Sequence, residues 1–103
     1  EISASSFDAV EDRPWDIVIN ATAASLAGEV PELPERCVGR DTVCYDMAYG
    51  RGDTTFMRWA AARGSQRAYK GWGMLVEQAA ESYLLWHGVR PETRPVMGAL
   101  DRL

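Results

Sequence analysis

Three short segments carry the residues whose types and spacing could do chemistry. They are Asn20-Ala21-Thr22, Asp46-Met47-Ala48-Tyr49, and residues 71–78, which begin Gly71-Trp72-Gly73 and end at Gln78. The first two follow apolar runs, and the third opens a stretch with helical periodicity. Open α/β sheets bind ligands at the carboxyl ends of their parallel strands. These segments are therefore the candidate binding residues, although a turn residue, a packing aromatic and a solvated helix position are the plain alternatives for Asn20, Tyr49 and Gln78.

Residue types alone predict no catalytic or metal-binding constellation. His87 is the only histidine, and it falls at the end of an expected helix, where a protonated ring favours the helix dipole. No serine has an evident histidine partner, and the carboxylates are scattered. Cys37 and Cys44 lack a CxxC or Cys/His spacing, so we expect two reduced thiols and no metal site. The glycine-rich GxGxxG fingerprint is absent as well.

Length and charge limit the classes of function. The 103 residues fit one small domain, and the 47% of apolar residues is ordinary for a globular protein. A net charge of −4 without a basic stripe argues against nucleic-acid binding. No apolar run approaches the ~20 residues that span a bilayer, so we expect no membrane partner and a cytoplasmic location. The chain begins at Glu1 without an initiator Met, which favours a piece of a longer protein and leaves a naturally short protein open.

The hydrophobic pattern predicts an α/β fold. The expected strands cover residues 16–20, 42–47 and, with a weaker pattern, 66–69. The expected helices run from a cap at Asp53 or Thr54 to Gly64, from 73 to 87, and from a cap at Thr93 to Leu100. On the long helix, the expected apolar stripe includes Leu75, Ala79, Tyr83 and Trp86. Such alternation indicates a parallel sheet of about three strands with covering helices, and an open edge.

Four blocks of sequence agree in order and spacing with one known family. The blocks are Asp16-Ile17-Val18-Ile19-Asn20-Ala21-Thr22 with Ala24-Ser25, then Val43-Cys44-Tyr45-Asp46-Met47-Ala48-Tyr49, then Gly71-Trp72-Gly73-Met74-Leu75-Val76-Glu77-Gln78-Ala79-Ala80, and last Leu85-Trp86-His87-Gly88-Val89-Arg90-Pro91 with Pro95-Val96. Over about residues 14–102, the chain resembles the C-terminal part of shikimate dehydrogenases.

The resemblance implies a fold and an activity. The family reduces 3-dehydroshikimate to shikimate with NADPH, on the route to aromatic amino acids, in a cleft between an N-terminal substrate domain and a C-terminal Rossmann-type domain. Residues 1–70 would form the second half of that NADP-binding domain, which is a doubly wound parallel sheet. Residues 71–103 would be helices that pack towards the missing substrate domain.

The resemblance also implies roles for seven residues. Asn20, Ala21 and Thr22 would line the dinucleotide. Met47 would pack against its nicotinamide side, and the Gly71 backbone would lie close to the nicotinamide. Tyr49 and Gln78 would bind the hydroxyl or carboxylate groups of the substrate. Such residues suit hydride transfer, in which the protein mainly positions the nicotinamide against the carbonyl carbon.

The chain departs from the family at one loop and lacks much of the family's machinery. Lys70 stands where the family usually has Asp, and Trp72 replaces a smaller apolar residue. The family's catalytic Lys and Asp lie in its N-terminal domain, outside this chain. Its phosphate-binding loop and the basic motif for the 2′-phosphate lie outside as well. We therefore expect the isolated chain to be inactive, while a preference for shikimate over quinate, or for NADP over NAD, stays open.

Two non-catalytic alternatives remain beside this enzyme fragment. The chain could be an association module, because Trp72, Met74 and Trp86 would leave an apolar patch once the rest of the enzyme is absent, and the sheet has an unprotected edge. Self-association is the expected consequence. The chain could also be an independent small binding protein that keeps only the half-fold.

Overall fold

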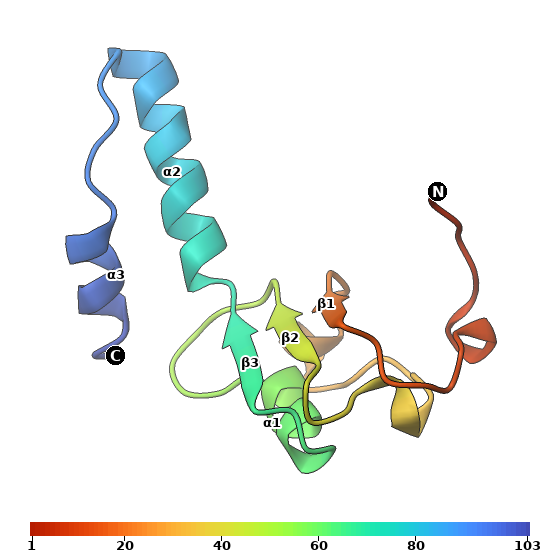
Figure 1. Ribbon diagram of the computed structural model, residues 1–103. Helices are drawn as coiled ribbons and strands as arrows, with labels where there is room; N and C mark the ends of the chain where they lie inside the picture. Colours follow the sequence, from red (N-terminus) through yellow and green to blue (C-terminus); the bar gives the residue numbers. More distant parts are fainter.

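A computed structural model describes residues 1–103 and contains one parallel sheet. Strands β1 (Ile17–Asn20), β2 (Val43–Asp46) and β3 (Arg67–Lys70) lie side by side in that order (Figure 1). Both neighbouring pairs are parallel, and the register places Asn20 opposite Asp46. The carboxyl ends of the strands therefore meet at one edge of the sheet, and the predicted α/β class with three parallel strands is confirmed.

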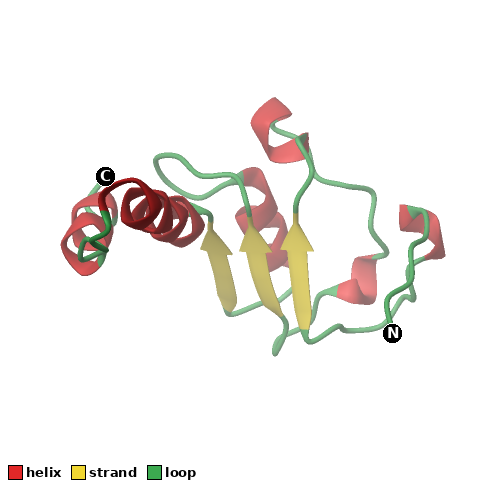
Figure 2. Ribbon diagram, turned by 90° about the horizontal axis from the view of Figure 1, so that it is seen from above, coloured by secondary structure: helices red, strands yellow, loops and turns green.

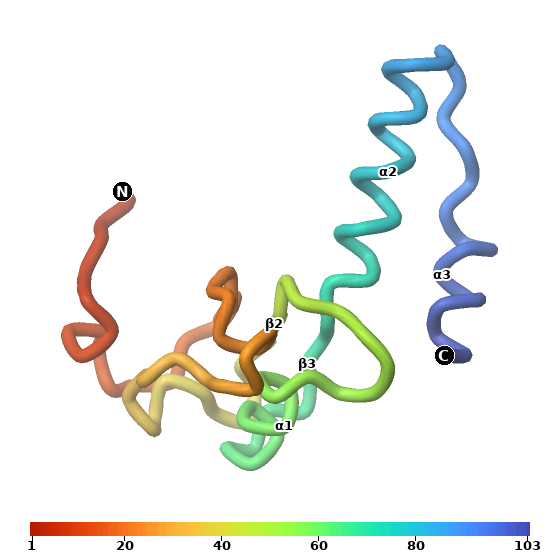
Figure 3. Tube along the Cα trace, turned by 180° about the vertical axis from the view of Figure 1, so that it is seen from behind, coloured from red at the N-terminus to blue at the C-terminus, as the bar shows by residue number.

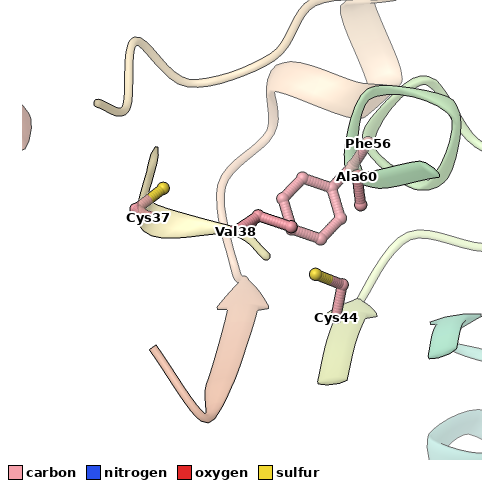
Figure 4. Packing of buried hydrophobic residues seen from close by; sticks show 5 residues of the cluster. All are labelled: Cys37, Val38, Cys44, Phe56 and Ala60. Atoms are coloured by element: carbon pink, nitrogen blue, oxygen red, sulfur yellow. The ribbon is translucent and has the colours of Figure 1, made fainter. Parts of the chain in front are cut away.

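Helix α1 (Thr55–Ala62) covers one face of this sheet (Figure 2). Its first turn is capped as predicted, because the Thr54 hydroxyl accepts a hydrogen bond from the Met57 amide at 3.2 Å. Its buried residues meet a small core formed with β2 and the segment before it (Figure 4). The core consists of Cys37, Val38, Cys44, Phe56 and Ala60.

The opposite face of the sheet has no such cover. On the three strands, the side chains of odd-numbered residues point to this side, and Ile17 and Ile19 of β1 are 62% and 60% exposed. Tyr69, at the same level on β3, is exposed as well. Parallel sheets are normally buried on both faces, so this chain presents an apolar surface of the kind that helices usually cover.

The last third of the chain forms an arm that extends from the sheet. Helix α2 (Trp72–His87) begins directly after β3, and α3 (Arg94–Leu100) runs back beside it (Figure 1, Figure 3). Arg90, in the connection, forms ion pairs with Glu77 and Glu81 of α2. Because of the arm, the radius of gyration is 15.7 Å, against about 13 Å for a compact chain of this length. None of the helices is long and apolar enough to cross a membrane.

A 3₁₀ turn at Ala24–Ala27 follows β1, at a place where the sequence predicted no helix. Two local expectations are wrong. On α2, Leu75, Ala79 and Tyr83 of the expected stripe face α3, but the buried residues are Val76 and Ala80, and Trp86 is 76% exposed. The physical reason is that α2 leaves the sheet, so within the chain only α3 packs along it. Thr93 precedes α3 without making a capping hydrogen bond.

Candidate functional site

A shallow hollow of about 390 Å³ lies at the carboxyl ends of β1 and β2, beside the start of α2. Its walls are mostly apolar, and they consist of Ala21, Thr22, Leu26, Met47, Ala48, Tyr49 and Met74. The fold thus brings together four residues that the sequence predicted, namely Ala21, Thr22, Met47 and Tyr49. An apolar hollow with two hydroxyl groups suits a planar ring that carries a polar substituent.

Asn20 lies below this hollow and points into the protein. The residue is 3% exposed, and every hydrogen-bonding atom of its side-chain amide has a partner inside the chain. The amide nitrogen donates to Asp46 and Ser25, each at 3.2 Å. Its oxygen accepts from the backbone amide and the hydroxyl of Thr22. The expected contact of Asn20 with a dinucleotide stays a prediction, and in this geometry its side chain holds Thr22 in place.

Gly71 connects β3 to α2 at a point where two backbones nearly touch. Its amide donates to the Ala48 carbonyl at 2.9 Å. A Cβ atom at this position would lie 2.3 Å from the carbonyl oxygen of Met47. Because real Cβ atoms essentially never come closer than 3.0 Å to such an atom, only glycine fits here. Gly71 therefore holds the start of α2 against the loop that carries Met47 and Tyr49.

The two departures from the family pattern, Lys70 and Trp72, lie beside Tyr49 and the loop that follows it. The rings of Tyr49 and Trp72 have centroids 5.0 Å apart. The Nζ atom of Lys70 lies 6.0 Å from the Trp72 ring centroid and donates to the Gly52 carbonyl at 2.7 Å. Lys70 thus ties down the loop after Tyr49, and Trp72 supplies a surface for the tyrosine ring. Together they support Tyr49 at the rim of the hollow.

Gln78, like Asn20 and Gly71, does not line this hollow. It is exposed on α2, one helical turn beyond Met74 and on the same side of the helix. Its amide nitrogen donates to the Leu75 carbonyl at 3.1 Å. A ligand that contacts both Gln78 and the hollow must therefore extend along α2.

Three residues that line the hollow were given no role from the sequence, although Ala48 and Met74 lie within the candidate segments. Leu26 belongs to the unexpected 3₁₀ turn, and no pattern pointed to it. Ala48 lies between Met47 and Tyr49, which are both predicted site residues, and this position was the available signal for a place in the site. Met74 belongs to the first turn of α2, where its amide donates to the Tyr45 hydroxyl at 3.2 Å. A methionine in an expected helix gives no hint of this contact.

The two cysteines belong to the core and not to a reactive site. Cys37 and Cys44 are both buried and unbonded to each other. Burial raises the pKa of both thiols, which keeps them in the less nucleophilic thiol form at neutral pH. Within residues 1–103, no group of three His, Cys, Asp or Glu side chains is arranged to hold a metal ion.

A second hollow, of about 430 Å³, runs between α2 and α3. Its lining is largely apolar and includes Leu75, Ala79, Tyr83, Val96 and Leu100. It contains none of the predicted site residues and few polar groups. The hollow at the strand ends, with its hydroxyl groups, is therefore the better candidate for binding a polar cofactor.

Comparison with known proteins points to one family. Residues 71–100 match the family model described as the shikimate 5'-dehydrogenase C-terminal domain. Shikimate dehydrogenase (NADP(+)) from Alkalilimnicola ehrlichii is 54% identical over 99 residues, which cover 96% of this chain and 36% of the relative. The enzyme of the same name from Aromatoleum aromaticum is 52% identical over 98% of this chain and 36% of its own length. The chain matches the C-terminal part of shikimate dehydrogenases.

Solved structures give the same result for the fold. The crystal structure of an Ael1 enzyme from Pseudomonas putida matches with a TM-score of 0.84 and 47% identity, covering 93% of this chain and 35% of that one. Shikimate dehydrogenase from Aquifex aeolicus matches with a TM-score of 0.63 and 25% identity, over 76% of this chain and 29% of its own. The fold is accordingly the C-terminal half of a Rossmann-type sheet, and the chain spans about a third of the length of these relatives.

Proposed function

We propose that this chain forms one wall of the active-site cleft of an NADP-dependent shikimate dehydrogenase. The full enzyme would reduce 3-dehydroshikimate to shikimate, in the cytoplasm, on the route to aromatic amino acids. The observation that carries this proposal is the meeting of Ala21, Thr22, Met47 and Tyr49 in one hollow at the carboxyl edge of the sheet. Relatives that share about half of this sequence are NADP-dependent shikimate dehydrogenases by name, which supports the choice of cofactor and substrate.

The residues of the hollow fit the nicotinamide end of the cofactor. Met47 and Ala21 offer an apolar surface for the ring, and the close approach of Gly71 to Met47 keeps that surface in place. NADPH, when bound, supplies the hydride. Tyr49 at the rim and Gln78 along α2 would hydrogen-bond the hydroxyl or carboxylate groups of the substrate and hold its carbonyl carbon towards the ring. In this proposal residues 1–70 belong to the cofactor domain and residues 71–103 lie towards the substrate domain.

The isolated chain should be inactive with shikimate and NADP. By the family resemblance, the catalytic Lys and Asp and the phosphate-binding loop all lie outside these 103 residues. The direct assay follows NADPH absorbance after mixing the purified chain with shikimate and NADP. Steady turnover would contradict the proposal of an incomplete site.

The roles of Tyr49 and Gln78 can be tested in a hybrid enzyme. In this hybrid, the present chain replaces the matching C-terminal region of the Alkalilimnicola ehrlichii enzyme, to which it is 54% identical. Tyr49→Phe and Gln78→Ala should each raise the KM for shikimate by about tenfold, the effect of losing one or two hydrogen bonds. Ser82→Ala, one turn after Gln78 on α2, is the matched control and should leave KM unchanged. An unaltered KM in both site variants would refute the assigned roles.

Self-association of the isolated chain is the second candidate. The observation that favours it is the uncovered sheet face, where Ile17, Ile19 and Tyr69 are exposed beside an unpaired β1 edge. Light scattering over a range of concentrations should show species larger than the 11.4 kDa monomer. A monomeric mass at high concentration would count against this candidate. The genomic reading frame would separate a fragment from a naturally short binding protein.

A further inference from the structure

A buried carboxylate joins the loops that line the hollow. Asp46, the last residue of β2, has 0% exposure. One oxygen accepts from the Ser25 hydroxyl at 2.6 Å, and the other accepts from the Asn20 amide nitrogen at 3.2 Å and the Ala48 backbone amide at 3.1 Å. A buried carboxylate is costly unless its oxygens are hydrogen-bonded, and these three donors meet that requirement. No step of the proposed function uses this side chain.

Asp46 fixes the orientation of the Asn20 amide. A carboxylate that already accepts from Ser25 and Ala48 can offer Asn20 only acceptor oxygens, so the NH₂ group of Asn20 must face it. The amide oxygen then faces the other way, towards Thr22. The Thr22 backbone amide, which donates to the Asn20 oxygen at 3.1 Å, requires the same orientation. Asp46 and this backbone amide thus together select one of the two amide orientations.

The orientation of Asn20 in turn fixes what Thr22 can do. Because the Asn20 oxygen cannot donate, the short contact of 2.6 Å between it and the Thr22 hydroxyl uses the hydroxyl proton. One lone pair of the same hydroxyl accepts from the Ala24 amide at 3.3 Å. What remains on this exposed residue is a single lone pair. Thr22 can therefore accept a hydrogen bond from a ligand, but it cannot donate one.

We propose that Asn20, oriented by Asp46 and by the Thr22 backbone amide, is a positioning residue that makes Thr22 an obligate hydrogen-bond acceptor, so that the hollow selects a ligand group bearing an N–H or O–H donor over an anionic oxygen. This inference rests on the proposed function, since it assumes that Thr22 faces the cofactor. A carboxamide on an aromatic ring has such a donor, whereas a carboxylate or a phosphate group in the same place has none. Asp46 acts through Asn20, and Asn20 acts through Thr22.

The test compares two probes that differ at one group. Nicotinamide mononucleotide carries a carboxamide, and nicotinic acid mononucleotide carries a carboxylate at the same ring position. Binding to the 103-residue chain is followed by the amide NMR signals of Thr22, Met47 and Ala48. The unmodified chain should bind the carboxamide probe at least about fivefold more tightly, the worth of one hydrogen bond, and inorganic phosphate should shift none of these signals.

Asn20→Ala should abolish this discrimination. Without the Asn20 oxygen, the Thr22 hydroxyl no longer uses its proton inside the chain, and it can donate to a ligand as well as accept from one. Both probes should then bind within about twofold of each other. Gln66→Ala removes an amide side chain from an exposed position before β3 and should keep the discrimination. If Asn20→Ala does not fold, Thr22→Val removes the acceptor itself at an exposed position and should give the same loss.

Amide exchange separates positioning from a general loss of structure. In Asn20→Ala, exchange should speed up at Thr22, whose amide loses its partner, while Ala48, Cys44 and Tyr45 keep their protection. Equal acceleration at all four amides would overturn the inference, as would a variant that still discriminates between the probes. If the unmodified chain binds neither probe, the cofactor role of the hollow fails first. If it binds both equally, only the inference about Thr22 fails.

Discussion

Replacing Gly71 by alanine should strongly destabilise the chain, and the structure gives the size of the effect. The new Cβ would lie 2.3 Å from the Met47 carbonyl oxygen, so the two backbones must separate by about 0.7 Å to reach the 3.0 Å limit. Overpacking of this kind costs about 1–3 kcal/mol. The movement also stretches the hydrogen bond from the Gly71 amide to the Ala48 carbonyl, which adds about 1 kcal/mol. The unfolding free energy should fall by about 2–4 kcal/mol.

Gly73, two residues later, provides a matched control. A Cβ there would meet only the Tyr45 hydroxyl, at 4.0 Å, which is an ordinary contact. Gly73 lies inside α2, where alanine is favoured over glycine by about 0.5–1 kcal/mol. The two Gly→Ala substitutions are therefore expected to change stability in opposite directions.

Urea unfolding followed by circular dichroism is the assay. With a denaturant slope of about 1–3 kcal/mol per molar, the midpoint of Gly71→Ala should fall by about 1–2 M, while that of Gly73→Ala stays level or rises. A Gly71→Ala midpoint equal to that of the unmodified chain would refute the close approach of the two backbones. Equal losses in both variants would refute it as well, because they would reflect α2 and not the contact with Met47.

Three further predictions concern the chain alone. Thr54→Ala removes the cap of α1 and should lower the unfolding free energy by about 1 kcal/mol in urea, whereas Thr55→Ala should change it little. Hydrogen bonds from Thr93 and Arg90 lower the pKa of Glu77. This stabilisation is present above the usual glutamate pKa and is lost as the pH falls through the lowered value. The protection factors of the α3 amides, taken relative to unstructured peptide at the same pH, should therefore fall in acid, and Glu77→Gln should remove that dependence. Burial raises the pKa of both cysteine thiols, so a thiol reagent at neutral pH should label neither before unfolding and both afterwards; rapid labelling of the native chain would contradict this.

Much of the fold was predictable because its signals are local. The apolar run before Asn20 and the one before Met47 each have the length of a strand. Thr54 precedes α1 and Gly64 follows it, and both residue types are common at helix ends. The rule that ligands bind at strand carboxyl ends then pointed to the residues around the hollow. Such predictions need only the period of the pattern and the conformational preferences of single residues.

The rest depends on contacts between distant segments. Val43, Cys44 and Tyr45 are all apolar, so the pattern did not reveal which face of β2 is buried, and the inward direction of Asp46 could not be inferred. The need for glycine at position 71 arises from the path of another loop, which no local pattern encodes. The buried side of α2 likewise follows from α3 packing beside it in place of the sheet.

The hybrid enzyme tests the central claim most directly. Shikimate-dependent NADP reduction is measured for three proteins: the isolated chain, the Alkalilimnicola ehrlichii enzyme without its matching C-terminal region, and the hybrid that joins this chain to that truncated enzyme. We predict that the two separate parts are inactive and that the hybrid turns over. A hybrid that folds and binds NADP but does not oxidise shikimate would contradict the account of this chain as one wall of a shikimate dehydrogenase active site.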